Sequence, residues 1–478
     1  MATVQALESV QIGALPFDKF EDILEPGQWR QVSDAADRAR DLFAGRVIWN
    51  VNSTSRGGGV AEMLVSLLAY ARGVGVNTRW EVISGNPDFF ALTKRIHNNL
   101  HGAPGDGGDL GERERGIYAA ALEPNIRQFT GMVSPRDVVI VHDPQPAGLV
   151  GPLVDMGVPV IWRCHVGLDA PNELTRKAWS FLRPYVAKAN ALVFSRKAFV
   201  WEDLPDDRIS IIAPSIDAFS PKNQELPAEN VKAILEAAGI YEDGHEIGHA
   251  LFTRVDGSPA RVAAMAQLWQ GGPLCEDDRY VLQVSRWDRL KDPLGVIRGF
   301  VDHIAPETDA HLVYAGPAVE AVSDDPEGEE VLSEARDLFD RLDPDMQKRV
   351  HLAALPMGDL EENAAIVNAL QRDAAVVVQK SLAEGFGLTV AEGMWKARPV
   401  AASRIGGIQD QIVDGVSGVL IDDPTDLAEY GSKVTALLNE PERADEIGRN
   451  AMERVREDFL GVRSLLQYFE LIHPLLRD

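Results

Sequence analysis

Two glutamates stand around a glycine turn in the second half of the chain. Glu384 precedes the turn at residues 385–387, and Glu392 follows Glu384 by eight positions. The apolar run 374–378 predicts a strand before the turn, and residues 388–397 predict a helix after it. The first backbone N–H groups of a helix have no intrahelical partner and carry partial positive charge, so a phosphate can approach them closely across glycine. The pattern predicts an anion site, with Glu392, two helical turns further on, reaching another part of the same ligand.

The spacing of the two glutamates alone also fits a solvated helix face. Several pairs eight residues apart are expected in a chain this rich in glutamate. However, a second glycine turn, Gly406-Gly407, follows another predicted strand at residues 399–403. The succession of strand, glycine turn, helix, strand and glycine turn favours the anion site, and Lys380, just before the first turn, can approach the same ligand.

A second group of polar residues follows the first predicted strand of the second half. Ser285 and Arg286 come at its end, and Lys291 follows Arg286 by five positions. Arg presents a planar fork and Lys a point charge, so both can bind a diphosphate. Salt bridges to Asp288 and Asp292 explain the same residues equally well on spacing alone.

Three glycines, Gly57, Gly58 and Gly59, follow the first predicted strand of the chain and precede a predicted helix at residues 60–72. A turn that merely connects strand to helix is the plain alternative. At the first helix of a nucleotide-type sheet, we favour a cradle of backbone N–H groups. The cluster does not fit the full dinucleotide fingerprint, which argues against a nicotinamide cofactor.

Two further groups of polar residues end strands in the first half. Arg163 and His165 close one predicted strand, and Asp143 and Gln145 follow another within the run HDPQP. A lone histidine at such a place is more often structural than catalytic, and a proline-bracketed turn with an Asx hydrogen bond explains Asp143 and Gln145 almost as well as a bound hydroxyl. Ligands of open α/β sheets bind at the carboxyl ends of strands, so all four residues are candidates.

The sequence resembles the retaining glycosyltransferases built from two Rossmann-like domains, the GT-B architecture. Their signature is a Glu, seven residues and a second Glu, with GFG after the first, which QKSLAEGFGLTVAEGMWK matches. This segment and the segment HDPQP are similar to the trehalose synthase and trehalose phosphorylase branch of that family. The Arg after a strand, followed five residues later by a Lys before Asp-Pro, fits the same pattern. The resemblance covers roughly residues 45–220 and 280–470.

The resemblance implies transfer of glucose from a nucleoside diphosphate glucose to the anomeric hydroxyl of a second glucose, with retained configuration, to give trehalose. Glu392 would bind ribose hydroxyls, Glu384 the sugar, and His165 a sugar hydroxyl or the transition state. No metal is implied, and no cofactor beyond the nucleotide sugar, because cations and helix N-termini neutralise the diphosphate. The implied catalytic residues are His165, Glu384, Arg286 and Lys291; the donor-binding residues are Gly58, Gly59, Ser285, Arg286, Lys291, Lys380, Gly385, Phe386, Gly387, Leu388 and Glu392; the acceptor-binding residues are Gly57, Asp143, Gln145 and Arg163.

The composition of the chain limits which classes of binding partner and which cellular compartment we expect. With a formal charge of −26 and a pI near 4.8, the chain has no basic excess for nucleic acid or an anionic membrane. Its two cysteines cannot form a disulfide framework, and no run of about 18 apolar residues occurs. The N-terminus lacks a basic region followed by an apolar core. We therefore expect a soluble cytoplasmic protein with small-molecule substrates, for which a homodimer is compatible with the sequence.

The 478 residues are too many for one hydrophobic core and predict two α/β domains, each a doubly wound, Rossmann-like sheet, facing across a cleft. We expect an N-terminal extension at 1–44, an acceptor domain at 45–220, a hinge with an inserted helical segment at 221–278, a nucleotide-sugar domain at 279–455 and a C-terminal helix at 456–478 that crosses back to the first domain. Strands are predicted at residues 47–51, 80–84, 138–142, 158–165, 191–195 and 209–213 of the first half, and at 280–287, 311–316, 350–355, 374–379, 399–403 and 419–422 of the second.

Three other functions stay open on the sequence. A trehalose phosphorylase would use the same residues with phosphate and trehalose in place of the nucleotide. A related retaining transferase would use another small acceptor, such as a phosphosugar or a glycerate. A non-catalytic nucleotide-sugar sensor ranks last, because it would keep the phosphate-binding groups and lose sugar-facing groups such as Glu384 and His165, which are both present.

Overall fold

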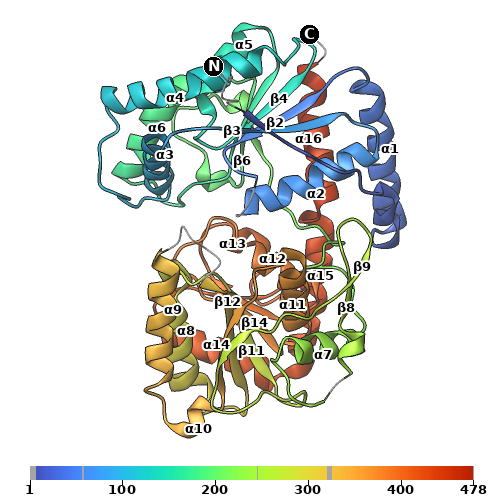
Figure 1. Ribbon diagram of the computed structural model, residues 1–478, viewed down its shortest axis with the longest axis vertical. Helices are drawn as coiled ribbons and strands as arrows, with labels where there is room; N and C mark the ends of the chain where they lie inside the picture. Colours follow the sequence, from blue (N-terminus) through green and yellow to red (C-terminus); the bar gives the residue numbers. More distant parts are fainter. Residues whose placement is uncertain (1–6, 56–58, 245, 320–325, 477–478) are drawn as a thin grey trace. The chain divides into compact units, whose positions relative to one another are not determined.

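The computed structural model describes residues 7–55, 59–244, 246–319 and 326–476. The chain divides into two compact units, residues 1–215 with 461–478 and residues 216–460, here called unit 1 and unit 2. Each unit is built on one seven-stranded, mainly parallel sheet (Figure 1), which confirms the predicted α/β class. No helix within the described residues combines the length and apolar character needed to cross a membrane.

Unit 1 has the strand order β1-β3-β2-β4-β5-β6-β7, in which only β1 runs antiparallel to its neighbour. The chain passes from β2 to β3 on one side and returns to β4 on the other, so the strand order reverses between β2 and β4. Ligands of such sheets bind beside the carboxyl ends of the strands at this switch point. The strands are β1 (Leu7–Val10), β2 (Ile48–Asn52), β3 (Thr78–Ile83), β4 (Val138–His142), β5 (Val160–Cys164), β6 (Ala191–Phe194) and β7 (Ile209–Ile211).

Helices cover both faces of the unit 1 sheet, and the alternation of side chains along β4 shows it. Val139 and Val141 pack into one apolar cluster with α3, α4 and α6, whereas Val138 and Ile140 pack into a second with α1 and α16. Figure 1 shows α16, the last helix of the chain, beside α1. The helices are α1 (Pro26–Leu42), α2 (Gly59–Gly73), α3 (Pro87–Leu100), α4 (Glu112–Thr130), α5 (Val150–Asp155), α6 (Glu173–Val186) and α16 (Gly461–Leu475).

Unit 2 has the strand order β10-β13-β12-β11-β14-β15-β16, and the six strands from β13 to β16 in this order run parallel to one another. Its switch point lies between β11 and β14, where the chain turns from one half of the sheet to the other. β10 pairs antiparallel with β13 at the edge. The strands are β10 (Gln267–Trp269), β11 (Tyr280–Val284), β12 (His311–Pro317), β13 (Val350–Leu355), β14 (Val376–Gln379), β15 (Val400–Ser403) and β16 (Val419–Ile421).

Helices also lie on both faces of the unit 2 sheet. Side chains of α8, α9 and α14 form one apolar cluster with the strands, while α11 and α12 pack on the other side (Figure 1). Residues 221–278 belong to unit 2 and carry α7 and a small two-stranded sheet of β8 (Leu251–Thr253) and β9 (Pro259–Arg261). The helices are α7 (Ala228–Ala237), α8 (Pro293–Gly299), α9 (Pro326–Phe339), α10 (Pro344–Gln347), α11 (Leu360–Asp373), α12 (Leu388–Trp395), α13 (Ile408–Gln411), α14 (Leu427–Asn439) and α15 (Pro441–Asp458).

Candidate functional site

The glycine turn of unit 2 joins β14 to α12 at the switch point. Gly387 has φ of 82°, a left-handed conformation that glycine adopts at little cost, and it precedes the first residue of α12. At Gly406, φ is 46° and a Cβ would lie 2.0 Å from the carbonyl oxygen of Glu384. The two glycine turns can therefore touch here because Gly406 has no side chain.

The contact between the two turns leaves donors without partners. The Gly407 N–H donates to the carbonyl of Gly385 at 2.8 Å, and the Gln411 side chain donates to the carbonyl of Phe386 at 2.6 Å. No hydrogen bond from the N–H groups of residues 385–388 to any described residue is present. A run of unpartnered amides at a helix N-terminus is a binding place for an anion.

Lys291 and Glu384 form an ion pair beside these amides. The Lys291 Nζ lies 2.6 Å from the Glu384 Oε2, and the two side chains are 15% and 14% exposed. Ser381 also donates its hydroxyl to the Glu384 Oε2, at 3.3 Å. The structure thus places a cation and a carboxylate together at the amide cluster, although they are 93 residues apart in the sequence.

A buried glutamine fixes the ends of β11 and β14 to the start of α12. Gln379 accepts a hydrogen bond from the Thr389 hydroxyl at 2.8 Å and donates to the hydroxyls of Ser285 and Ser381 at 3.0 and 2.9 Å. Because Ser381 bonds to Glu384, the amide of Gln379 supports the carboxylate through one intermediate. Ser285, a predicted donor-binding residue, is itself buried in this network.

Two other predicted donor residues, Arg286 and Lys380, lie in different surroundings. Arg286 is 66% exposed and donates to Asp288 at 3.0 Å, so one of the two anticipated salt bridges is present. Lys380 is fully buried and forms an ion pair with Asp292, whose other carboxylate oxygen accepts the Gly295 N–H. The described contacts join neither cation directly to Glu384.

Glu392 is buried one helix turn from the C-terminal end of α12. Its side chain is 4% exposed, its Oε1 lies 3.6 Å from the Lys222 Nζ, and its Oε2 has no hydrogen-bond partner in the described structure. Lys396 donates to the Glu392 carbonyl, and burial lowers the pKa of Lys396 to about 7. A buried carboxylate oxygen without a partner is costly, so the Oε2 is available to accept from a bound hydroxyl.

The switch point of unit 1 carries a chain of polar side chains from β2 to the loop after β5. The Asn50 Oδ1 lies 2.9 Å from the His142 Nε2, and the His142 Nδ1 lies 3.2 Å from the His165 Nε2. The two imidazole rings are stacked. Burial lowers the pKa of both, that of His142 to about 3, and the nearby Arg163 guanidinium adds to the effect.

This pattern of partners assigns the protons on the two neutral rings. The amide oxygen of Asn50 only accepts, so His142 carries its proton on Nε2 and its Nδ1 accepts from the His165 Nε2–H. The remaining nitrogen of His165, Nδ1, is then an acceptor. His165 can accept a hydrogen bond from a hydroxyl but, while neutral, cannot donate one from this atom.

The predicted acceptor residues divide between structural and free side chains. Asp143 has φ of 67° and accepts the backbone N–H of His165 at 2.8 Å; burial raises its pKa to about 6. Arg163 is 1% exposed and donates to the Phe194 carbonyl and the Ser195 hydroxyl, so its guanidinium holds the end of β6. Gln145 is half-buried, and no hydrogen bond joins its side chain to the described residues.

The glycine cradle of unit 1 is described only in part. Gly57 and Gly58, predicted to bind acceptor and donor, lie outside the described residues. Gly59 is the first residue of α2. Among the described residues, no group of three or more His, Cys, Asp or Glu side chains is arranged to hold a metal ion.

Comparison with known proteins finds one family match within each unit. Residues 50–201 match the family described as "Trehalose synthase, N-terminal domain", and residues 270–454 match "Glycosyl transferases group 1". The trehalose synthase of Pyrococcus horikoshii is 34% identical over 461 residues, which are 96% of each chain. The chain belongs to the trehalose synthase family. It is accordingly an enzyme of the hexosyltransferase class, and the resemblance drawn from the sequence is confirmed.

More distant proteins place the trehalose synthase family among GT-B glycosyltransferases. The trehalose phosphorylase of Pleurotus pulmonarius is 24% identical, over 84% of this chain and 53% of that protein. The structure of an α,α-trehalose-phosphate synthase (UDP-forming) from Burkholderia vietnamiensis superposes with a TM-score of 0.64 at 15% identity, covering 89% of this chain and 96% of that one. At this identity the structural likeness shows the fold alone.

Several residues in the polar groups at the two switch points were not predicted to bind or position a ligand. His142 ends β4, and that signal was available in the sequence, whereas Asn50 lies in the middle of the neighbouring strand β2. Gln379 lies at the end of β14, and only the fold shows that it bonds to Thr389, ten residues further along the chain. Lys222 lies in a segment with no strand pattern, so no sequence signal pointed to its contact with Glu392.

Proposed function

We propose that the chain transfers an α-glucosyl unit from a nucleoside diphosphate glucose to the anomeric hydroxyl of glucose, with retained configuration, to form α,α-trehalose. The observation that carries this proposal is the group of unpartnered amides at residues 385–388 next to the Lys291 to Glu384 ion pair. Amides and a lysine fit a diphosphate, and the adjacent carboxylate fits sugar hydroxyls. The trehalose synthase relatives support the choice of sugar and acceptor.

In this proposal unit 2 holds the donor. The amides of residues 385–388 and the ammonium group of Lys291 bind the diphosphate, and Arg286, which is exposed, adds a second cation. The Glu392 Oε2, which has no partner in the described residues, accepts from ribose hydroxyls. Once Lys291 turns to the diphosphate, Glu384 is released to accept hydroxyl groups of the glucose.

Unit 1 holds the acceptor and contributes His165. The His165 Nδ1 accepts a hydrogen bond from a sugar hydroxyl, since the ring's other nitrogen donates to His142. Gln145 offers an amide that can bind an acceptor hydroxyl. Asp143 acts through the backbone of His165, whose N–H it fixes, and Arg163 holds the strand end behind it.

The transfer needs no carboxylate nucleophile. The bond from the anomeric carbon to the phosphate oxygen breaks, and the acceptor oxygen forms its bond to the same carbon on the same face. The acceptor's proton passes to the leaving phosphate oxygen, so charge and atoms balance. Lys291, Arg286 and the amides stabilise the negative charge that develops on the nucleoside diphosphate, and on this basis we propose that the reaction is metal-independent.

Product identification tests the proposal and separates it from the alternatives. The enzyme is incubated with ADP-, UDP- or GDP-glucose and ¹³C-labelled glucose as sole acceptor, and the product is identified by NMR. We expect α,α-trehalose with one of these donors. Formation of glucose 1-phosphate from trehalose and phosphate, without reaction of any nucleotide sugar, would instead identify a phosphorylase, and absence of any disaccharide would point to another acceptor.

The expectations about binding partners, cellular location and oligomeric state stay predictions. The strongly acidic composition supports small sugar and nucleotide-sugar substrates and argues against nucleic acid and membrane partners. The two reduced cysteines are consistent with a cytoplasmic location. A homodimer stays untested and is checked by light scattering of the purified protein.

A further inference from the structure

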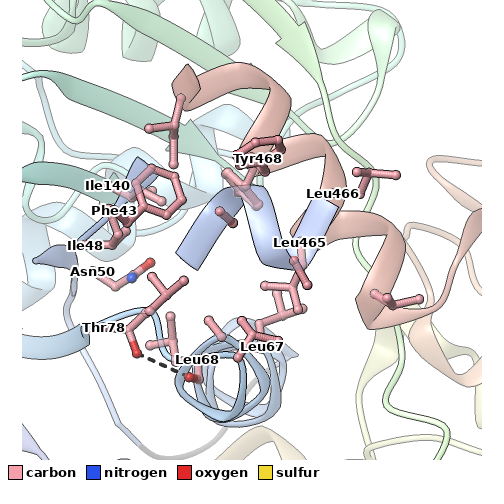
Figure 2. A pocket seen from close by; sticks show the side chains of 18 of the residues that line it. Phe43, Ile48, Asn50, Leu67, Leu68, Thr78, Ile140, Leu465, Leu466 and Tyr468 are labelled. Atoms are coloured by element: carbon pink, nitrogen blue, oxygen red, sulfur yellow. Dashed lines mark hydrogen bonds between the residues drawn. The ribbon is translucent and has the colours of Figure 1, made fainter. Parts of the chain in front are cut away.

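Unit 1 contains an apolar cavity on the opposite side of β2 and β4 from α3 and α4. Its volume is about 110 Å³, and residues of helices α1, α2 and α16 line it together with strands of the sheet. Figure 2 shows Leu67 and Leu68 of α2 on one side, Leu465 and Tyr468 of α16 on another, and Asn50 and Thr78 at the strands. Among the described residues that line it, none is a lysine, arginine, aspartate or glutamate.

Four of the residues that line this cavity have polar side chains, Asn50, Thr78, His142 and Tyr468, and the first three differ in their partners. Thr78 donates its hydroxyl to the Leu68 carbonyl at 3.2 Å. Both ring nitrogens of His142 are used, one with Asn50 and one with His165. Asn50 is 2% exposed, yet its Nδ2 has no hydrogen-bond partner in the described structure.

A buried N–H donor without a partner costs about 1–3 kcal/mol, so the fold retains an unfavourable group at the cavity wall. A water molecule would relieve this only in part, because an ordered buried water takes about three hydrogen bonds and the apolar wall supplies few. A ligand with one acceptor atom and an otherwise apolar body matches the site better.

We propose that this cavity is a binding site for a small, neutral, mainly apolar molecule whose one hydrogen-bond acceptor takes the Asn50 Nδ2–H. An apolar cavity of about 150 Å³ in another protein binds benzene, so one of about 110 Å³ suits a single six-membered ring at most. The absence of charged side chains from the described lining excludes a charged ligand, whose desolvation would have no compensation.

The position of Asn50 connects this site to the polar chain at the switch point. The same carboxamide that offers Nδ2 to the cavity holds the His142 ring through Oδ1, and His142 in turn holds His165. A ligand that orients the Asn50 amide therefore restrains the His165 ring as well. We expect the imidazole NMR signals of His142 and His165 to shift when the cavity is filled.

Two probes of matched shape test the site. Cyclohexanone carries one acceptor, whereas cyclohexane carries none, and both are titrated into the full-length protein by calorimetry. We expect saturable binding of one molecule of each, with cyclohexanone about fivefold tighter because a net hydrogen bond is worth about 1 kcal/mol. Equal affinities, or no saturable binding of cyclohexanone, would overturn the proposal.

Variants then locate the binding. Ala35→Leu fills the cavity from α1 and is expected to abolish binding of both probes, while Ala44→Leu, at an exposed position just after the same helix, is the matched control. Asn50→Leu is expected to bring the two affinities to equality. Binding by Ala35→Leu as strong as by the wild type would contradict the assignment, and if a variant fails to fold, the probe comparison on the wild type already decides.

Discussion

Replacement of Lys291 by methionine separates the two tasks that the structure gives this side chain. Methionine keeps much of the apolar stem and removes the charge. Glu384 then loses the ammonium group 2.6 Å away and, among the described residues, keeps the Ser381 hydroxyl at 3.3 Å. A hydrogen bond to a charged group contributes about 1.5–3 kcal/mol, and partial exposure reduces this to about 1–2 kcal/mol of stability. For a unit the size of unit 2, the melting temperature should fall by about 2–8 °C.

The same variant should lose activity for a second reason. A charge-assisted bond from Lys291 to the donor diphosphate is worth about 1.5–3 kcal/mol, which corresponds to a loss of about 10–150-fold in kcat/KM. Steady-state kinetics with the nucleotide sugar and differential scanning calorimetry measure the two effects. In the double variant with Glu384→Gln, stability should partly return because the buried carboxylate is gone, whereas activity should not.

Two arginines provide the matched comparison. Arg286 is 66% exposed and bonds to Asp288, so Arg286→Ala should leave the melting temperature nearly unchanged. The same variant should still lower kcat/KM. Arg289 lies nearby but is occupied by Glu330 and Glu334, and Arg289→Ala should leave kcat/KM near that of the wild type. Activity of the Lys291 variant close to that of the wild type would contradict a role of Lys291 in diphosphate binding. Equal losses of kcat/KM in the two arginine variants would contradict the specific role of Arg286.

Two further predictions concern Asp143 and Gln379. Burial raises the pKa of Asp143 from 3.8 to about 6, so its contribution to stability is present below about pH 4 and is lost as pH rises to about 6. In Asp143→Asn the side chain stays neutral and can still accept the His165 N–H. Above pH 6, the free energy of unfolding of this variant, measured in urea, should exceed that of the wild type by up to about 3 kcal/mol, and near pH 4 it should show no gain. An unchanged pH profile of stability would contradict this. Gln379→Leu removes the support of Ser381, so the effect of Glu384→Gln on kcat should be smaller in that background than in the wild type, and full additivity would contradict the coupling through Ser381.

Much of the fold follows from short apolar runs in the sequence. Strands β4 and β13 begin and end where the sequence predicts them, at Val138–His142 and Val350–Leu355, because β-branched and apolar side chains fill both faces of a covered parallel strand. The edge strands β1 and β10 were not predicted. They are only four and three residues long, and their pairing depends on the neighbouring strand rather than on their own pattern.

The candidate site was predicted by position but not by contact. That Lys291 and Glu384 both lie after strands at the switch point follows from the order of elements. That they bond to each other, and that Lys380 is instead buried against Asp292, depends on side-chain packing across separate loops. Arg163 shows the same limit, because a strand-end arginine looks available in sequence and is 1% exposed in the fold.

The proposed function depends most on binding of a diphosphate by the backbone amides of the glycine turn in unit 2. ¹⁵N-TROSY spectra of the glycine-labelled protein, titrated with the nucleoside diphosphate of the preferred donor, test this directly. We expect saturable shifts of the Gly385 and Gly387 amide signals that become weaker in Lys291→Met. Nucleotide binding that saturates while these two signals stay unchanged would contradict it.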